Sequence, residues 1–226
     1  MNPLTCRLGL TALLMCLSAP VMAERPMNVD DASTLPLHGA KLEFGWSKDD
    51  KARGIEAAAG YSPIENVELE ISGGRARDTD PSPSETIRGI GGAIKWVPLQ
   101  ADVGLSAGLK YEYSNEKVEG QASHAQALLG LMSWNFEDGS KIHLNLGREF
   151  AREAGDTEAE NTWGVGLDYA ITESVHATVE TFGSQHSAPD RALGLRYEIM
   201  PGLKVSGAVG RGNDRSIANA GIAWEF

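Results

Sequence analysis

Apolar and polar residues alternate along most of the chain from Gly39 onward. Residues 67–72 read Val-Glu-Leu-Glu-Ile-Ser, and residues 142–147 and 193–199 repeat this pattern. A repeat of two residues is typical of a β-strand whose two faces meet different surroundings. The pattern predicts an all-β fold with twelve strands near residues 39–47, 54–62, 66–76, 85–97, 101–114, 122–136, 140–151, 161–171, 174–184, 190–199, 202–211 and 216–226.

The non-apolar face of these strands carries many small residues, among them Gly104, Gly108, Gly164, Gly166 and Gly221. In a soluble sandwich, large side chains fill the core and the wet face carries long polar ones. Small residues on one face instead leave room inside a closed sheet. We therefore predict a closed antiparallel up-and-down transmembrane β-barrel, with the apolar face toward lipid and the other face toward a polar lumen.

The connectors and the aromatic residues favour the same topology. Tight turns are expected near residues 62–65, 98–100, 137–139, 172–173 and 200–202, and longer charged loops near 48–53, 77–84, 115–120, 152–160, 185–189 and 212–215. The fifteen aromatic residues fall at two levels along the strands, with Phe182 at the level of the longer loops. Trp and Tyr prefer the two interfaces of a bilayer, so we expect two aromatic girdles and both chain ends on the periplasmic side.

The first 23 residues read as a secretory signal peptide. They hold one charged residue, Arg7, then an apolar stretch from Leu8 to Leu17 and small residues before the cut after Ala23. A lipid anchor at Cys16 is disfavoured because Met15 stands where a lipoprotein signal has a small residue. The expected organisation is a cleaved signal peptide (residues 1–23), a short periplasmic tail (24–38) and a transmembrane barrel (39–226).

The net charge of the chain is −11, and of the basic residues only Arg7 falls within the signal peptide. This acidic balance excludes a nucleic-acid partner, since a basic stripe supplies the affinity in that class. Both cysteines, at positions 6 and 16, also lie in the signal peptide. With no paired-Cys, HExxH or glycine-rich phosphate motif, we expect neither a metal site nor a cofactor.

The last six residues, Gly221 to Phe226, resemble the C-terminal signature of Gram-negative outer-membrane β-barrel proteins. That signature is a terminal Phe with apolar residues at every second position before it. The resemblance implies location in the cell outer membrane and recognition by the barrel-assembly machinery through Ile222, Trp224 and Phe226. The chain is also similar to small twelve-stranded channels and transporters of that superfamily, and unlike an autotransporter, whose barrel follows a long passenger.

If the apolar face meets lipid, the inward side chains can be assigned by parity. The expected pore lining is Lys41, Glu43, Glu56, Glu68, Glu70, Lys95, Asp102, Lys110, Glu112, His143, Glu149, Asp168, His176, Glu180, Arg196, Glu198, Lys204 and Glu225, with Asn145, Thr178 and Asn219 as neutral members. Acidic residues outnumber Lys and Arg in this set by eleven to five. An unbalanced charge in a narrow lumen concentrates ions of the opposite sign, so we predict a channel for small cationic or neutral polar solutes.

Two alternatives remain open. The first is a plugged structural barrel that acts in adhesion through its outer loops, because Lys41, Lys95, Arg196 and Glu198 fall near one end and could interlock as ion pairs. The second is an outer-membrane lipid acyl hydrolase using Ser123–His124 or His186–Ser187. Neighbouring side chains on a strand point to opposite faces, so we expect no enzyme.

Arg88 and Arg148 fall on the apolar parity near the outer rim. An arginine at the midplane of a bilayer costs about 2–4 kcal/mol, whereas one at the interface costs little. We therefore expect these two side chains to contact phosphates of lipopolysaccharide, unless a bulge turns them inward.

Overall fold

The computed structural model describes residues 25–119, 121–153 and 156–226, so the expected signal peptide lies outside the described residues. Twelve strands account for most of the described chain. The described residues contain no helix that is long and apolar enough to cross a membrane. The strands are β1 (Ala40–Lys48), β2 (Ala52–Ile64), β3 (Val67–Asp78), β4 (Glu85–Leu99), β5 (Gly104–Val118), β6 (Gln121–Asn135), β7 (Lys141–Glu153), β8 (Asp156–Ala170), β9 (Val175–Ser184), β10 (Asp190–Met200), β11 (Leu203–Gly212) and β12 (Arg215–Glu225).

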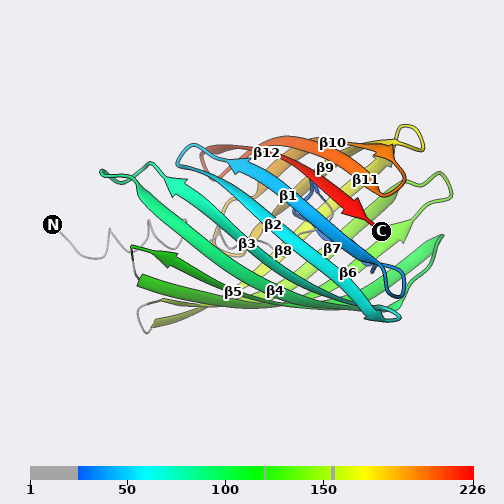
Figure 1. Ribbon diagram of the computed structural model, residues 1–226, viewed down its shortest axis with the longest axis horizontal. Coiled ribbons are helices and arrows are strands. Elements are labelled where there is room, and N and C mark those ends of the chain that lie inside the picture. Colours follow the sequence, from blue (N-terminus) through cyan, green and yellow to red (C-terminus); the bar gives the residue numbers. More distant parts are fainter. Residues whose placement is uncertain (1–24, 120, 154–155) are drawn as a thin grey trace.

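Each strand pairs with the next in antiparallel register, and β1 pairs with β12 to close the barrel (Figure 1). The predicted fold class, a closed antiparallel up-and-down barrel of twelve strands, is confirmed. The backbone N–H of Phe226 donates to the carbonyl of Ala40, and the N–H of Ala40 donates to the carbonyl of Phe226. The closing seam therefore joins the two ends of the sheet down to the last residue.

The alternation in the sequence separates the two faces of the wall. In β3, Leu69 and Ile71 are 42% and 70% exposed on the outer surface, while Glu68 and Glu70 are 5% and 6% exposed on the inner one. Apolar side chains that are exposed on a closed barrel, beside buried carboxylates, are opposite to the arrangement of a soluble protein. This inversion is what a barrel with an apolar outer band and a polar interior requires.

The expected difference between short turns and long loops is not found. Much of the sequence assigned to loops extends the strands instead. Strand β5 continues to Val118 and β6 starts at Gln121, while β7 continues to Glu153 and β8 starts at Asp156. These segments lack apolar alternation, because few of their side chains are apolar on either face, so periodicity could not reveal them as strands. We call the end that holds the β1–β2 and β3–β4 connectors the loop end, and the end that holds Phe226 the turn end.

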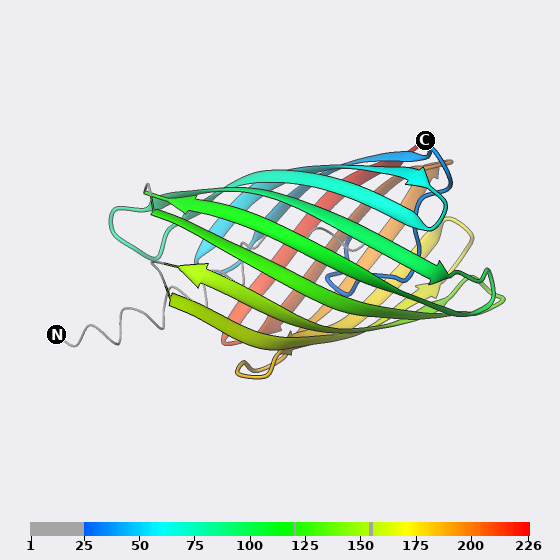
Figure 2. The same cartoon turned by 90° about the horizontal axis from the view of Figure 1, so that it is seen from below.

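The segment expected as a periplasmic tail lies instead inside the barrel. Residues 25–38 lie inside the barrel and run toward the turn end, where His38 donates its N–H to the carbonyl of Ser62 and β1 begins; they are the blue chain enclosed by the strands in Figure 2. Met27, Val29, Ala32 and Leu35 in this segment are each at most 8% exposed. A tail in the periplasm would bury none of them, so the expectation for residues 24–38 is corrected. We call residues 25–38 the plug.

Candidate functional site

Small residues on the inner wall give the plug its space. A Cβ atom built at Gly45 or at Gly221 would overlap the side chain of Arg25, and one at Gly166 would overlap Met27. A Cβ at Gly164 would lie 2.8 Å from a methyl carbon of Val29. The inward glycines that predicted a roomy lumen therefore do provide room, and the N-terminal segment occupies it.

Hydrogen bonds and ion pairs tie the plug to eight of the twelve strands. The partners are Glu56 on β2, Glu68 on β3, Lys95 on β4, Lys110 on β5, Ser133 on β6, Asn145 on β7, Glu180 on β9 and Asn219 on β12. Several of them bind the backbone of the plug: Glu180 accepts from the N–H groups of Asn28 and Val29, and Glu68 accepts from that of Leu35. Backbone groups far from water need such partners.

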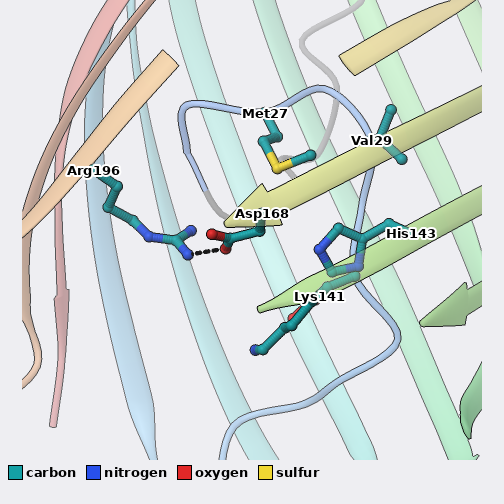
Figure 3. Close-up of a pocket in the computed structure, with 7 residues that line it drawn as sticks. Met27, Val29, Lys141, His143, Asp168 and Arg196 are labelled. Carbon is teal, nitrogen blue, oxygen red and sulfur yellow. Dashed lines mark hydrogen bonds and ion pairs between the residues drawn. The ribbon is translucent and has the colours of Figure 1, made fainter. Parts of the chain in front are cut away.

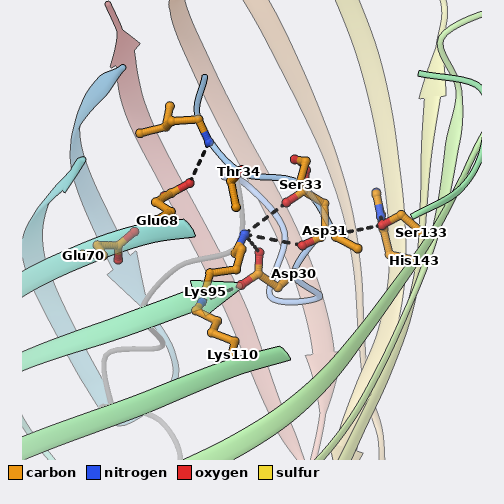
Figure 4. A network of polar contacts seen from close by, with 12 residues as sticks. Asp30, Asp31, Ser33, Thr34, Glu68, Glu70, Lys95, Lys110, Ser133 and His143 are labelled. Atoms are coloured by element: carbon orange, nitrogen blue, oxygen red, sulfur yellow. Dashed lines mark hydrogen bonds and ion pairs between the residues drawn. The ribbon is translucent and has the colours of Figure 1, made fainter. Parts of the chain in front are cut away.

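A buried ion cluster joins Asp30 of the plug to two lysines of the wall (Figure 4). One Asp30 oxygen accepts from Lys95 Nζ at 2.7 Å, and the other accepts from Lys110 Nζ. Lys95 also contacts Asp31 at 3.2 Å. Burial opposes ionisation of Asp30, but the two lysines outweigh it and hold the pKa of Asp30 below its usual value. At neutral pH, Asp30 therefore carries the charge that both lysines need.

Other luminal charges are paired as well. Lys41 Nζ lies 2.8 Å from Glu68 and 2.9 Å from Glu70, and Arg25 of the plug pairs with Glu56. Two further groups join wall residues: Asp168 contacts both Arg196 and His176, and Lys204 contacts Glu225. Buried pairs add little net stability, but removing one partner leaves the other uncompensated. The Arg25–Glu56 pair therefore helps to fix the position of the plug, while the other pairs lie within the wall.

Two apolar clusters complete the packing. Ala32 of the plug contacts Val97 on β4 and Leu131 on β6, with Leu129 against them. This contact explains why Leu128 and Leu129 interrupt the alternation of β6: the wall is locally apolar inside, where it meets the plug.

A second cluster joins Met27 and Val29 of the plug to Phe182 on β9. The assignment of Phe182 to the outer aromatic girdle was therefore wrong, since its side chain faces inward beside the plug. Thirteen of the fifteen aromatic residues are exposed, as girdle positions require.

The space between the plug and the wall is small beside Met27 and Val29. A cavity of about 10 Å³ lies between Met27, Val29 and Asp31 of the plug and Lys141, His143, Asp168 and Arg196 of the wall (Figure 3). A single water molecule needs about 10–15 Å³ measured in this way, so a solute cannot fit beside the plug at this level. At this level of the barrel, the plug fills the space between the facing walls.

The structure places most of the expected lining residues on the inner wall. The inward members are Lys41, Glu43, Glu56, Glu68, Glu70, Lys95, Lys110, Glu112, His143, Asn145, Glu149, Asp168, His176, Thr178, Glu180, Arg196, Glu198, Lys204, Asn219 and Glu225. Asp102 is a correction: it lies exposed in the turn before β5. The strand starts at Gly104 rather than at Ala101, so the parity assigned to Asp102 does not apply.

Sequence reasoning missed the plug charges Arg25, Asp30 and Asp31. They lie before the first strand, where the sequence has no alternation of apolar and polar residues that would assign a side chain to the inner or outer face. No local signal could therefore place them in the lumen. It also missed an ion cluster at the loop end, in which Arg215 contacts Asp49 at 3.4 Å and Asp190 at 2.9 Å.

Arg88 and Arg148 both lie exposed on the outer face. The Arg148 guanidinium donates to Asn161 Oδ1 at 3.0 Å and lies 5.5 Å from the ring centre of Phe150. No bulge turns either arginine inward, because the register is regular around both.

The serine–histidine pairs considered for hydrolysis are not assembled. Ser123 is buried on the inner face, while its neighbour His124 lies on the same parity as exposed Leu128. Ser133 does contact His143, at 2.8 Å, but its oxygen also accepts from the N–H of Ala32, so the plug covers the pair. Within the described ranges, no group of His, Cys, Asp and Glu is arranged to hold a metal ion.

The comparison with protein families gives one match, over residues 11–220, to the family described as "Uncharacterised conserved protein UCP029691". The chain belongs to this family. No curated protein matches it.

Solved structures with the same fold are outer-membrane barrels. A KdgM porin is 14% identical, with 82% of this chain and 99% of that one covered and a TM-score of 0.63. An outer membrane channel from Pseudomonas putida F1 is 9% identical, covers 87% and 98%, and has a TM-score of 0.60. The translocator domain of autotransporter NalP from Neisseria meningitidis is 13% identical, covers 96% and 94%, and has a TM-score of 0.56. The predicted resemblance to outer-membrane β-barrel proteins is confirmed at the level of the fold.

Proposed function

We propose that this protein is an outer-membrane channel for passive passage of small polar solutes, and that residues 25–38 close it at rest. The observation that carries the proposal is that charged and polar groups of the inner wall bind residues 25–38, a segment that is not a strand of the barrel. The segment enters from one end and is continuous with only one strand, β1. It can therefore leave without breaking the ladder of the barrel, which β1 and β12 close independently.

The solutes we propose are cationic or neutral. With the plug out, the inward positions assigned from the sequence still hold ten acidic residues against five Lys and Arg, because only Asp102 leaves that set. Excess carboxylates in a narrow space between low-dielectric walls concentrate cations. The fold neighbours support solute passage in general: one is titled "KdgM porin in complex with disordered oligogalacturonate".

The proposed location is the outer membrane, with both chain ends in the periplasm. Ile222 and Trp224 are exposed on the outer face of β12, and the ring of Phe226 lies 4.8 Å from that of Trp224. This terminal apolar face supports recognition by the barrel-assembly machinery, as the resemblance of the last residues implies.

A second candidate is a permanently plugged barrel that serves adhesion or envelope integrity through its loops. The ion network around Asp30 and the cavity of only about 10 Å³ favour it. The two candidates share one structure and differ in a single property, which is whether the plug leaves the lumen.

Ion selectivity in planar bilayers tests the proposed function. In the chain without its plug, we expect a reversal potential of cation-preferring sign under a salt gradient. Glu149→Gln with Glu180→Gln should lower the cation-to-anion permeability ratio by about twofold to fivefold per carboxylate, since a unit charge at contact distance contributes about 1 kcal/mol in water. Glu137→Gln in an exposed turn is the matched control and should leave the ratio unchanged. Anion preference, or release of lyso-lipid instead of current, would refute the proposed function.

A further inference from the structure

The outer wall of the barrel carries charge of one sign only. Among the strand residues that the structure describes, outward positions hold ten charged side chains, and all ten are Lys or Arg. We call them the rim cations: Lys48, Arg53, Arg75, Arg77, Arg88, Lys117, Arg148, Arg152, Arg191 and Arg211. Each is exposed, and none forms an ion pair with a carboxylate of the described chain. The chain as a whole is acidic, so this separation does not follow from composition.

The rim cations all lie in the half of the wall next to the loop end. On the other half, the outward strand positions of the described chain carry no charge and end in aromatic residues such as Trp96, Trp134 and Tyr169. If both leaflets had the same chemistry, we would expect similar numbers of charged residues on the outer face of the two halves. The asymmetry indicates that the leaflet at the loop end is rich in anionic groups.

Several rim cations lie directly opposite one another in the sheet register. Arg53 pairs with Lys48 on one side and Arg77 on the other. Arg88 pairs with Arg75 on one side and Lys117 on the other. Like charges at such positions destabilise a sheet, because their Cβ atoms are about 4.5–5.5 Å apart. Two adjacent rows of like charge therefore need anions from outside the chain.

An apolar groove begins at these rows. Its volume is about 660 Å³, and it lies on the outer face of β12, β1, β2 and β3. Ala57 and Gly73 form its floor, Phe44 and Ile55 stand beside them, and Arg75 borders it. A Cβ at Gly73 would meet only ordinary contacts, the nearest at 3.6 Å, so the floor is open above this glycine.

We propose that the rim cations around Arg75 and Arg88 form a binding site for a phosphorylated, acylated lipid of the lipopolysaccharide class, with one acyl chain in the groove. Arginine fits phosphate because its planar fork donates two parallel hydrogen bonds. The groove accounts for the acyl chain, and the charge rows account for a headgroup with more than one phosphate. The site also sets the orientation: the loop end faces the leaflet that holds this lipid.

Binding of purified lipid A to the whole refolded protein in detergent, followed by native mass spectrometry, tests this site. Arg75→Gln with Arg88→Gln should weaken binding by about tenfold or more, since each guanidinium loses its charge-assisted hydrogen bonds to phosphate. The matched control is Arg191→Gln with Arg211→Gln, an opposed pair on β10 and β11 away from the groove, which should weaken binding by less than about threefold.

Two further probes separate headgroup from chain. Gly73→Leu, which fills the groove floor, should weaken binding of lipid A and leave binding of inorganic phosphate unchanged. Dephosphorylated lipid A should bind the parent protein as weakly as intact lipid A binds the Arg75/Arg88 variant. Equal losses for the two arginine pairs would show attraction by bulk surface charge and overturn the site, as would unchanged binding to Gly73→Leu. These readouts use no conductance, so they are independent of the channel proposal.

Discussion

Replacing residues 25–37 by a Gly/Ser linker of equal length is expected to convert a nearly silent barrel into one that conducts steadily. The linker keeps the chain length but removes Asp30 and the apolar side chains that hold the plug. In a barrel of eight strands, the side chains just fill the interior. A twelve-stranded barrel with inward glycines is wider, so we expect a continuous path through it once the plug is gone. We expect the mean current in planar bilayers to rise by at least about tenfold, because the plug no longer favours the closed state.

A control for this replacement is a linker of the same composition in place of residues 79–84, an exposed connector at the loop end. That variant should remain as silent as the parent. If the plug replacement stays silent while its heat-modified mobility on gels shows a folded barrel, another element closes the lumen and the proposed role of residues 25–38 is wrong.

Asp30→Asn is expected to loosen the plug with a single atom change. The amide keeps the shape of the carboxylate but removes the negative charge that Lys95 and Lys110 share, and its NH2 group faces one of them where an oxygen accepted a hydrogen bond. Asp31 still pairs with Lys95, and Glu112 still pairs with Lys110. A lost hydrogen bond between buried charged groups costs about 2 kcal/mol, which corresponds to roughly thirtyfold in the open fraction. Open probability in single-channel records measures the change.

Asp80→Asn provides the matched control for the charge. Asp80 pairs with Lys51 at 3.2 Å, but both side chains are at least half exposed, and exposed pairs contribute little. Its open probability should equal that of the parent. An Asp30→Asn channel no more open than this control would mean that the lysine cluster does not hold the plug.

The barrel could be predicted from the sequence because its signal is local. Leu69 and Ile71 alternate with Glu68 and Glu70 because one face of the strand meets the apolar surroundings and the other meets the barrel interior. Every strand has these two faces, so the pattern does not depend on what fills the interior. The same reasoning placed the inward charges on the correct face wherever the strand boundary was correct. It failed at Asp102 because the parity of a residue has no meaning before the strand begins.

The plug could not be predicted because its position depends on contacts distant in sequence. Asp30 meets Asn145 across 115 residues, and Val29 meets Glu180 across 151. The sequence does carry traces of it on the wall: Leu131 and Phe182 are large apolar residues at inward positions, where a water-filled lumen would hold polar ones. Such apolar residues on the polar parity of a barrel strand indicate that something is packed inside.

A reversible disulfide between plug and wall tests the central claim most directly. Ala32→Cys with Ser133→Cys joins two residues already in contact, since the Ala32 nitrogen lies 2.8 Å from Ser133 Oγ. Both native cysteines, at positions 6 and 16, fall within the expected signal peptide, so they should not compete for this disulfide. Introduced into the Asp30→Asn chain, the oxidised pair should abolish the current and a reductant should restore it in the same membrane. Equal currents before and after reduction would contradict a channel closed by its own N-terminal segment.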